Sequence, residues 1–375
     1  MNASTADFGT TDLKPIPTND TRVSAVAKPI TARERFLRAA RCLPVDHPPA
    51  WIMRQAGRAL PEYRILKEKY SFLQLAQNPE LAAEVTLQPI RRFRFDAAII
   101  FSDILVIPEA MGVGYKFRET GGVEMEFPIC SESDVKNLSV ERVVEKLQYV
   151  LEAIRLVKTE LRGQTALLGF AGSPWTLANY MLDGGSVSHH TKALALFREN
   201  RPLFDQLCEK LSQAVLQFLR MQVLSGADAV QIFDSLGGLL PAAEFNAASG
   251  VWLRQIVDSL GSVIPVIIFS KGTRDWETLA GTGAHVIGVD YTISLSSARE
   301  ALGPHFALQG NLDPAYIISD SPEMIAARVE VLLEEMRGQP GYIFNLGHGL
   351  RPNSRLENIQ AVLETIRATN NSPSF

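Results

Sequence analysis

Eight short runs of apolar or β-branched residues recur along the chain, and they constrain its fold more than any other feature. Amphipathic helical patterns lie between most of them. Apolar strands that alternate with helices indicate an α/β protein whose parallel sheet is covered by helices, and eight repeats favour closure into a (β/α)8 barrel of the TIM type. The eight predicted strands are 50–53, 97–101, 166–170, 229–233, 265–269, 285–289, 305–308 and 342–344.

The segment 143–157 carries a clear helical pattern that would bury one face. An open, doubly wound sheet is the rival architecture. Against it, no Gly-x-Gly-x-x-Gly motif follows an early strand, because 169–172 holds only a pair of glycines. The apolar residues of the helical pattern are Val143, Leu147, Val150, Leu151, Ile154 and Val157.

One stretch interrupts the alternation of strands and helices. Residues 111–128 are rich in glycine, and Val123, Met125 and Phe127 alternate with other residues. This pattern predicts a hairpin inserted after the second strand, not a separate domain.

The two ends of the chain differ in composition from its middle. Thr31 and Glu34 form a capping-box pattern, so we expect the folded domain to begin there. Residues 1–30 are rich in Thr, Asn, Asp, Ser and Pro, which predicts a disordered extension, and 369–375 form a polar, flexible tail. A single domain is expected over 31–368.

Composition excludes several classes of partner. Lys and Arg number 37 against 41 Asp and Glu, giving a net charge of −4, so no overall positive field would attract nucleic acid. No membrane partner is expected, because the chain lacks a spanning apolar run and a secretory signal, and a cytoplasmic location follows. Cys42, Cys130 and Cys208 are odd in number and widely spaced, which indicates neither a disulfide framework nor a metal site.

Two arginines, Arg54 and Arg58, follow the first predicted strand with a four-residue spacing around Gly57. A guanidinium group is always charged, and its planar fork matches a carboxylate or phosphate. An arbitrary pair of arginines is more often a solvated helical face. Here the apolar run 51–53 comes directly before the pair, and a strand that ends in charge delivers polar groups to the rim of a barrel. We interpret the pair as an anion site.

The segment 53–58 resembles the N-terminal signature of the uroporphyrinogen decarboxylase family, and 169–176 resembles its other signature. The similarity runs from about residue 31 to about residue 366. Ala59 stands where the family usually has an aromatic residue, and 350–354 departs from the family's sequence. Further blocks match in the family's order at 101–105, 180–181, 233–235 and 347–349.

The resemblance implies a barrel that removes the four acetate carboxyl groups of uroporphyrinogen III, giving coproporphyrinogen III without a metal or an organic cofactor. It also implies a homodimer. The residues that it assigns to substrate contact are Arg54, Arg58, Asp103, Tyr180, Ser235 and His348. The other polar residues that follow predicted strands are rim candidates, namely Ser173, Asp234, Ser270, Lys271, Asp290, Tyr291, Asn311 and Asp313.

The resemblance makes Asp103 the main catalytic residue, whereas an isolated Asp at this position would more often cap a helix. Decarboxylation of a pyrrole acetate requires a ring that is first protonated on carbon, and one carboxylate can face all four pyrrole N–H groups. A carboxylate about 4 Å from that cation contributes roughly 4 kcal/mol at an effective dielectric constant near 20. Arg54 is a second catalytic candidate for proton delivery, although a guanidinium group gives up its proton reluctantly.

The remaining site residues have plain structural alternatives. Tyr180 could be a core aromatic, and Ser235 beside Asp234 resembles a nucleophile, but no histidine lies nearby in sequence, so we reject covalent catalysis. His348 between two glycines suits a donor to a carboxylate better than a packed core residue. Barrel filling is the default role for apolar strand residues. Those predicted to line the pocket are Met53, Ile99, Phe170 and Phe233.

Two other functions stay open. A zinc-dependent corrinoid methyltransferase of the same superfamily would hold its metal through His and Cys near the strand ends, but His285 lacks a thiolate partner. The pair His189–His190 resembles a metal site only superficially, because adjacent side chains point in different directions. A non-catalytic tetrapyrrole-binding protein is the second alternative, and Asp103 together with both arginines argues against it.

Overall fold

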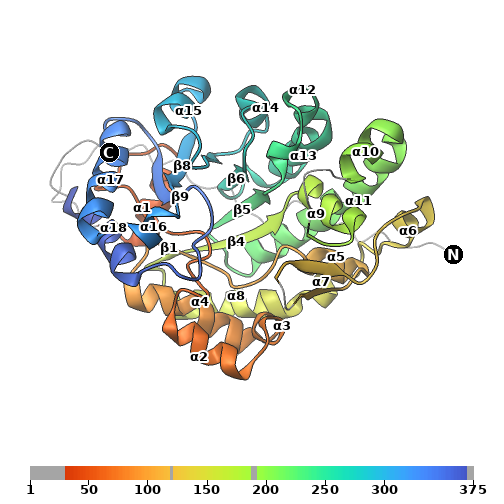
Figure 1. Cartoon of the computed structure of the whole chain (residues 1–375), viewed down its shortest axis with the longest axis horizontal. Helices are drawn as coiled ribbons and strands as arrows, with labels where there is room; N and C mark the ends of the chain where they lie inside the picture. Colours follow the sequence, from red (N-terminus) through yellow and green to blue (C-terminus); the bar gives the residue numbers. More distant parts are fainter. Residues whose placement is uncertain (1–29, 119–120, 187–191, 370–375) are drawn as a thin grey trace.

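The computed structural model describes residues 30–118, 121–186 and 192–369. Seven strands form one sheet in the order β1-β4-β5-β6-β7-β8-β9, and every neighbouring pair is parallel (Figure 1). These strands confirm seven of the eight predicted runs and the α/β barrel. They are β1 (Ala97–Ile99), β4 (Ala166–Gly172), β5 (Ala229–Asp234), β6 (Val266–Ser270), β7 (Val286–Gly288), β8 (Ala307–Leu312) and β9 (Tyr342–Leu346).

The predicted strand 50–53 is wrong in extent, since only Ala50 forms a β-bridge, parallel to Phe344. Backbone bonds still join both edges of the sheet through it, because Phe344 N donates to Pro49 O at 2.8 Å and Asp96 N donates to Ala50 O at 2.9 Å. Proline has no N–H, so pairing cannot extend backwards. Beyond the bridge, Met53 N donates to the side chain of Asn345 and not to a backbone carbonyl of the neighbouring strand.

Helices surround the sheet, as expected for the strand–helix alternation (Figure 1). The long helix α11 packs against α9 and α13, and α4 packs against α8. The helices are α1 (Ala32–Ala39), α2 (Pro61–Lys69), α3 (Phe72–Gln77), α4 (Pro79–Phe93), α5 (Val106–Met111), α6 (Glu132–Asn137), α7 (Val143–Lys146), α8 (Gln148–Leu161), α9 (Pro174–Asp183), α10 (Lys192–Glu199), α11 (Arg201–Leu224), α12 (Ala242–Phe245), α13 (Val251–Leu260), α14 (Trp276–Gly281), α15 (Leu295–Leu302), α16 (Tyr316–Ser319), α17 (Pro322–Glu335) and α18 (Leu356–Ala368), with a 3₁₀ turn η1 (Gly237–Leu239) and a π-helical turn η2 (Asn246–Gly250).

The helical pattern over 143–157 is confirmed, with one interruption at Leu147, which separates α7 from α8. All six apolar residues of the pattern are buried. At the start of the domain, the Thr31 hydroxyl accepts from Glu34 N at 3.1 Å and α1 begins as predicted. The reciprocal half of the capping box is replaced, because the Glu34 carboxylate pairs with Arg38 at 2.8 Å.

The predicted hairpin insertion is confirmed. Strands β2 (Tyr115–Phe117) and β3 (Val123–Met125) pair antiparallel, with Tyr115 opposite Met125. The hairpin follows α5, which itself follows β1. It returns Tyr115, a buried aromatic residue, towards the loop that ends β1.

Polar side chains link buried residues from different strands. The Trp51 indole donates to Gln309 Oε1 at 2.9 Å, and the Gln309 amide donates to Gln231 Oε1 at the same distance. Gln231 in turn donates to the Met53 sulfur at 3.8 Å. Buried amides with partners fix side-chain geometry, so this chain of contacts holds Met53, and with it the start of the 53–58 segment.

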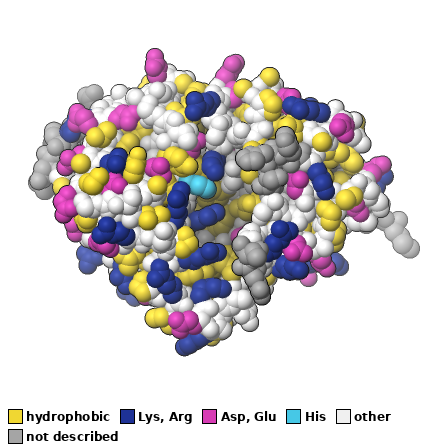
Figure 2. All heavy atoms as spheres, viewed as in Figure 1, with side chains coloured by type: hydrophobic (Ala, Val, Ile, Leu, Met, Phe, Trp, Pro, Cys, Tyr) yellow, Lys and Arg dark blue, Asp and Glu magenta, His cyan; other side chains and the backbone are white. Residues whose placement is uncertain are grey.

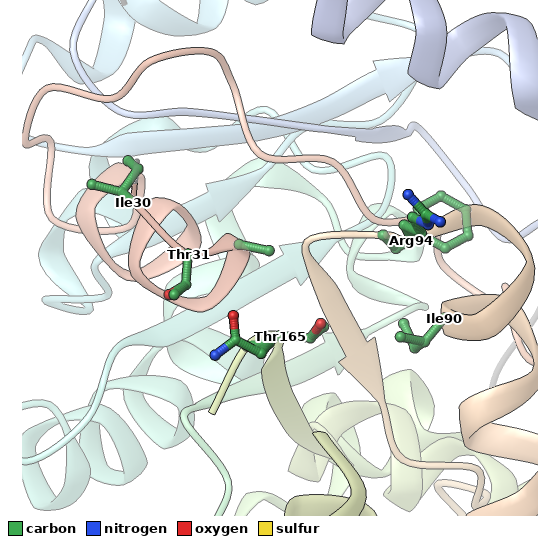
Figure 3. A pocket seen from close by; sticks show the side chains of 8 residues that line it. Ile30, Thr31, Ile90, Arg94 and Thr165 are labelled. Atoms are coloured by element: carbon green, nitrogen blue, oxygen red, sulfur yellow. The ribbon is translucent and has the colours of Figure 1, made fainter. Parts of the chain in front are cut away.

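A pocket of about 420 Å³ lies near the amino ends of β1 and β4 (Figure 3). Thr31 and Ile30 at the start of α1 face Ile90 and Arg94 from the end of α4, with Thr165 beneath them. This end of a barrel serves stability in enzymes of the fold, whereas chemistry gathers at the carboxyl ends.

Some predictions cannot be compared with the structure. The extension 1–29, the tail 370–375 and the pair His189–His190 lie outside the described residues. Among the helices of the described ranges, none combines the length and apolar character that crossing a bilayer requires.

Candidate active site

The predicted site residues lie beyond the carboxyl ends of the strands. Asp103 follows β1, Ser235 follows β5 and His348 follows β9, while Tyr180 lies on α9 after β4 and Arg54 follows the Ala50 bridge. Carboxyl ends of parallel strands meet at one face, which is where this fold places its sites. Figure 2 shows a hollowed face on which Lys and Arg side chains and a histidine border hydrophobic side chains.

The segment that carries Arg54 is a turn, not a helix. Arg54 has a left-handed backbone with φ of 63°, so the chain reverses directly after Met53. Gln55 is buried and anchors the turn, because its side chain accepts from Ile52 N at 3.0 Å and donates to Ala97 O of β1 at 2.9 Å. The turn leaves the Arg54 and Arg58 side chains exposed.

Asp103 lies in the loop between β1 and α5. One carboxylate oxygen, Oδ1, accepts from Leu105 N at 2.8 Å, which closes a turn in the loop; α5 itself has no side-chain cap, and its N-cap residue is Leu105. Its other oxygen has no protein donor within the described residues. The side chain is half-buried and densely surrounded by protein atoms. This burial raises the pKa of Asp103, while the Leu105 N–H and the Arg54 charge lower it. A donor-rich ligand would therefore stabilise the carboxylate.

Tyr180 shares the electrostatic environment of Asp103. Burial raises the pKa of the Tyr180 hydroxyl, the Asp103 charge raises it further and the Arg54 charge lowers it. The helix α9 that carries it begins at Ser173, whose hydroxyl accepts from Thr176 N at 3.0 Å. The structure thus brings Arg54, Asp103 and Tyr180 together from three separate parts of the chain.

Three titratable side chains near Asp103 were not predicted from the sequence. Burial raises the pKa of Tyr115 on the hairpin, of Tyr149 on α8 and of Glu109 on α5, and in each case the nearby Asp103 charge raises it too. The hydroxyls of both tyrosines are buried without a hydrogen-bond partner in the described protein. No sequence motif marks these residues, because the hairpin and helix packing alone brings them to Asp103.

Ser235 follows a buried carboxylate that ties three strand ends together. Asp234 accepts from the Ser173 hydroxyl at 2.6 Å and from the Ser270 hydroxyl at 2.7 Å. These bonds join the ends of β4, β5 and β6. Burial raises the pKa of Asp234, while its hydroxyl partners lower it. Asp234 thus fixes the loop, and Ser235 is the half-buried residue of the pair.

His348 is half-buried between Gly347 and Gly349. Burial, together with the charges of Lys271, Arg54 and Arg351, lowers its pKa to about 4, and the Asp290 charge opposes this shift. The imidazole is therefore neutral at pH 7, where it can donate a hydrogen bond but adds no charge. A carboxylate bound beside it would take its positive counter-charge from the neighbouring cations.

Arg58 has different neighbours. Burial lowers the pKa of Lys67 on α2 and the Arg58 charge lowers it too, whereas burial raises the pKa of Tyr63 and the Arg58 charge opposes that rise. Arg58 thus lies by α2, while Arg54 lies by His348, so the four-residue spacing does not place the two guanidinium groups on one helical face.

The predicted pocket-lining residues differ in exposure. Phe233 is half-buried, whereas Met53, Ile99 and Phe170 are 3–8% exposed. The rings of Phe170 and Phe233 meet edge to face with centroids 5.5 Å apart, and Phe269 lies 6.4 Å from Phe233. Aromatic residues at the ends of β4, β5 and β6 thus form an apolar wall, of which Phe233 is the open member.

Comparison with known proteins decides the family. The family model described as uroporphyrinogen decarboxylase (URO-D) matches residues 31–369. The chain belongs to the uroporphyrinogen decarboxylase family. It is 44% identical to the uroporphyrinogen decarboxylase of Alkalilimnicola ehrlichii over 90% of this chain and 94% of that one. It is 42% identical to that of Idiomarina loihiensis over 92% and 98% of the two chains.

Family membership agrees with the barrel. A methyltransferase from Methanosarcina mazei superposes with a TM-score of 0.76 over 90% of this chain and 99% of that chain, at 19% identity. That likeness concerns the fold alone. Across residues 30–118, 121–186 and 192–369, no three His, Cys, Asp or Glu side chains gather as a metal site would require. Because the family model and the relatives at 42–44% identity are uroporphyrinogen decarboxylases, the zinc-dependent methyltransferase alternative is not favoured.

Proposed function

We propose that this protein is a carboxy-lyase of porphyrin biosynthesis, which converts uroporphyrinogen III to coproporphyrinogen III by removing its four acetate carboxyl groups. The observation that carries the proposal is the convergence of Arg54, Asp103 and Tyr180 beyond the strand ends of a member of this family. Uroporphyrinogen decarboxylase relatives at 42–44% identity support the same reaction.

Asp103 acts in the central step, in which the pyrrole ring becomes cationic and CO₂ leaves. In each round a ring carbon of the pyrrole gains a proton and the ring becomes cationic. The bond between the acetate methylene and its carboxyl carbon then breaks, CO₂ leaves, and the electron pair flows into the ring. Proton gain at the methylene and proton loss from the ring complete the methyl group, with a net uptake of one proton. The Asp103 carboxylate stabilises the cation by roughly 4 kcal/mol, or about three orders of magnitude in rate.

The surroundings of Asp103 favour this interaction. Burial raises the pKa of Asp103, so its charged form is costly until a ligand supplies donors. Pyrrole N–H groups are such donors, and the oxygen of Asp103 that Leu105 N does not occupy is available to them. Substrate binding would therefore favour the ionised carboxylate that the reaction uses. This coupling needs no cofactor, because the pyrrole itself accepts the electrons.

The other site residues bind the periphery of the macrocycle in this proposal. Arg54 and Arg58 pair with carboxylate groups, and Arg54 is also a candidate for proton delivery. Tyr180, Ser235 and His348 donate hydrogen bonds to further carboxylates. Met53, Ile99, Phe170 and Phe233 belong to the apolar lining, and Phe233 is the most exposed of the four.

A direct assay tests the proposal. Purified protein is incubated anaerobically with uroporphyrinogen III, the products are oxidised, and the porphyrins are separated by their number of carboxyl groups. A ladder from eight to four carboxylates supports the decarboxylase. Tight binding without any ladder would instead identify a non-catalytic tetrapyrrole-binding protein. A cytoplasmic homodimer completes the proposal, and analytical ultracentrifugation at several concentrations tests the dimer.

A further inference from the structure

The loops after β6 and β7 lie beside the loop that carries His348. Gly272 N donates to the Asp290 carboxylate at 2.7 Å, which joins the residue after Lys271 to the end of β7. A side chain at Gly347 would collide with the backbone of Tyr291, so these two loops are in close contact. Lys271 therefore stands at the same edge of the site as His348.

The 53–58 turn closes against the other side of the same loop. Leu350 N donates to Met53 O at 2.8 Å. A Cβ atom at Gly349 would collide with the Arg54 side chain, so the aliphatic part of Arg54 packs directly over that glycine. Arg351 follows Leu350 and is exposed. Three cations from different segments thus surround one histidine.

These cations have no anionic partner of their own. The side chains of Arg54, Lys271 and Arg351 form no ion pair or hydrogen bond with the described part of the chain. Asp290 is the nearest acid to influence His348, but its Oδ2 accepts from Gly272 N. Its Oδ1 accepts from the backbone and hydroxyl of Thr292. Neighbouring cations repel one another, and an anion bound between them would relieve this repulsion.

We propose that Lys271 and Arg351 form, with Arg54 and His348, a carboxylate-binding subsite for ring side chains of the tetrapyrrole. This inference rests on the proposed function and adds two residues to it. Lys271 and Arg351 supply the charge, and His348 supplies a hydrogen bond from a neutral ring. Lys271 is half-buried and Arg351 is exposed, so the lysine contributes more.

Binding of the stable octacarboxylate uroporphyrin III tests the subsite. Lys271→Met nearly keeps the length of the side chain and removes its charge, and Arg351→Gln removes the charge at the rim while keeping a polar, shorter side chain. We expect about tenfold and about threefold weaker binding, respectively, with a smaller loss of affinity on adding salt than in the wild type. Arg220→Gln is the matched control, because Arg220 is also an exposed arginine but lies on α11. It should leave affinity unchanged.

The titration of His348, followed by NMR in the protein without porphyrin, provides a second measurement. Both substitutions should raise its pKa above the value of about 4, since each removes a positive charge nearby. The subsite is refuted if both variants bind uroporphyrin III within twofold of wild type, or if Arg220→Gln weakens binding equally. If wild-type protein decarboxylates uroporphyrinogen III while the variants bind normally, only this inference fails. If wild type neither binds nor converts tetrapyrroles, the proposed function fails, and the NMR shift still reports whether the cations cluster.

Discussion

Charged side chains are paired at the amino ends of the barrel strands, whereas those around His348 at the carboxyl ends are not, within the part of the chain that the structure describes. At the amino ends, Asp228 binds both Arg33 and Lys158, with contacts of 2.8 and 2.7 Å. Close to the same end, Arg35 bonds to Asp96 at 2.7 Å and also pairs with Asp46. Each buried carboxylate there has a cation, and the pairs join the first helix to the starts of β1 and β5.

At the carboxyl ends, the three cations around His348 have no such partner among the described residues. Arg54, Lys271 and Arg351 surround a neutral His348, and the one acid nearby, Asp290, is occupied by backbone and hydroxyl donors. Asp103 has one oxygen without a protein donor in the described ranges. Charges that are paired serve stability, whereas unpaired ones are available to a ligand. The comparison predicts that substitutions at the two ends change different measured quantities.

The largest expected effect is on the rate, at the carboxyl end. Asp103→Asn keeps the shape of the side chain and its bond from Leu105 N but removes the charge. Turnover of uroporphyrinogen III should fall by about three orders of magnitude, since roughly 4 kcal/mol of cation stabilisation is lost. Single-turnover kinetics measure this. Unfolding in urea serves as the control, and near-normal turnover in a well-folded variant would remove Asp103 from the mechanism.

The next effect is on stability, at the amino end. Asp96→Ala removes a buried carboxylate that holds Arg35 and also accepts from Ala50 N at 2.9 Å. The free energy of unfolding should fall by about 3 kcal/mol, because a buried guanidinium loses one partner and keeps only Asp46. Activity per folded molecule should be unchanged. An active-site defect at unaltered stability would contradict the division between the two ends.

Arg54→Gln makes the converse test at the carboxyl end. We expect kcat/KM to fall about thirtyfold, because a charge-assisted hydrogen bond to a substrate carboxylate contributes about 2 kcal/mol. Stability should stay within about 0.5 kcal/mol of wild type, since the Arg54 side chain makes no ion pair or hydrogen bond with the described residues. Chemical unfolding and steady-state kinetics on the same preparation separate the two effects. A loss of stability comparable to that of Asp96→Ala would show that the arginine is structural.

Much of the fold follows from local patterns in the sequence. Apolar runs mark seven strands because their side chains are buried on both faces of a parallel sheet. The run 50–53 has the same composition, but Pro49 and the side-chain bond of Met53 N limit pairing to one bridge. Composition thus predicts burial, while pairing depends on backbone donors that composition does not describe.

The candidate site was likewise predictable only in part. Motifs located Arg54, Asp103 and His348 because strand ends deliver polar residues to one face. They did not predict the left-handed turn at Arg54, which directs it towards Gly349 and separates it from Arg58. Nor did they predict Tyr115 and Glu109 near Asp103, since that proximity comes from the packing of the hairpin and α5. Contacts between distant segments have no local signature.

The last expected effect, similar in size to that of Arg54→Gln, concerns the histidine itself. The folded-state pKa of His348 is about 4, against 6.5 ordinarily, so the unfolded chain takes up its proton first as pH falls. The contribution of His348 to the free energy of unfolding is therefore fully present above pH 6.5, and it is lost as the pH falls towards 4. Allowing for partial exposure, the loss is about 2 kcal/mol.

His348→Gln has no such proton, so between pH 7 and pH 4.5 its unfolding free energy should fall less than that of wild type. Carboxylates titrate in both proteins and cancel in the difference. Equal losses would mean that His348 is solvated and distant from the cations, and the contrast between the two ends would then lack its central residue.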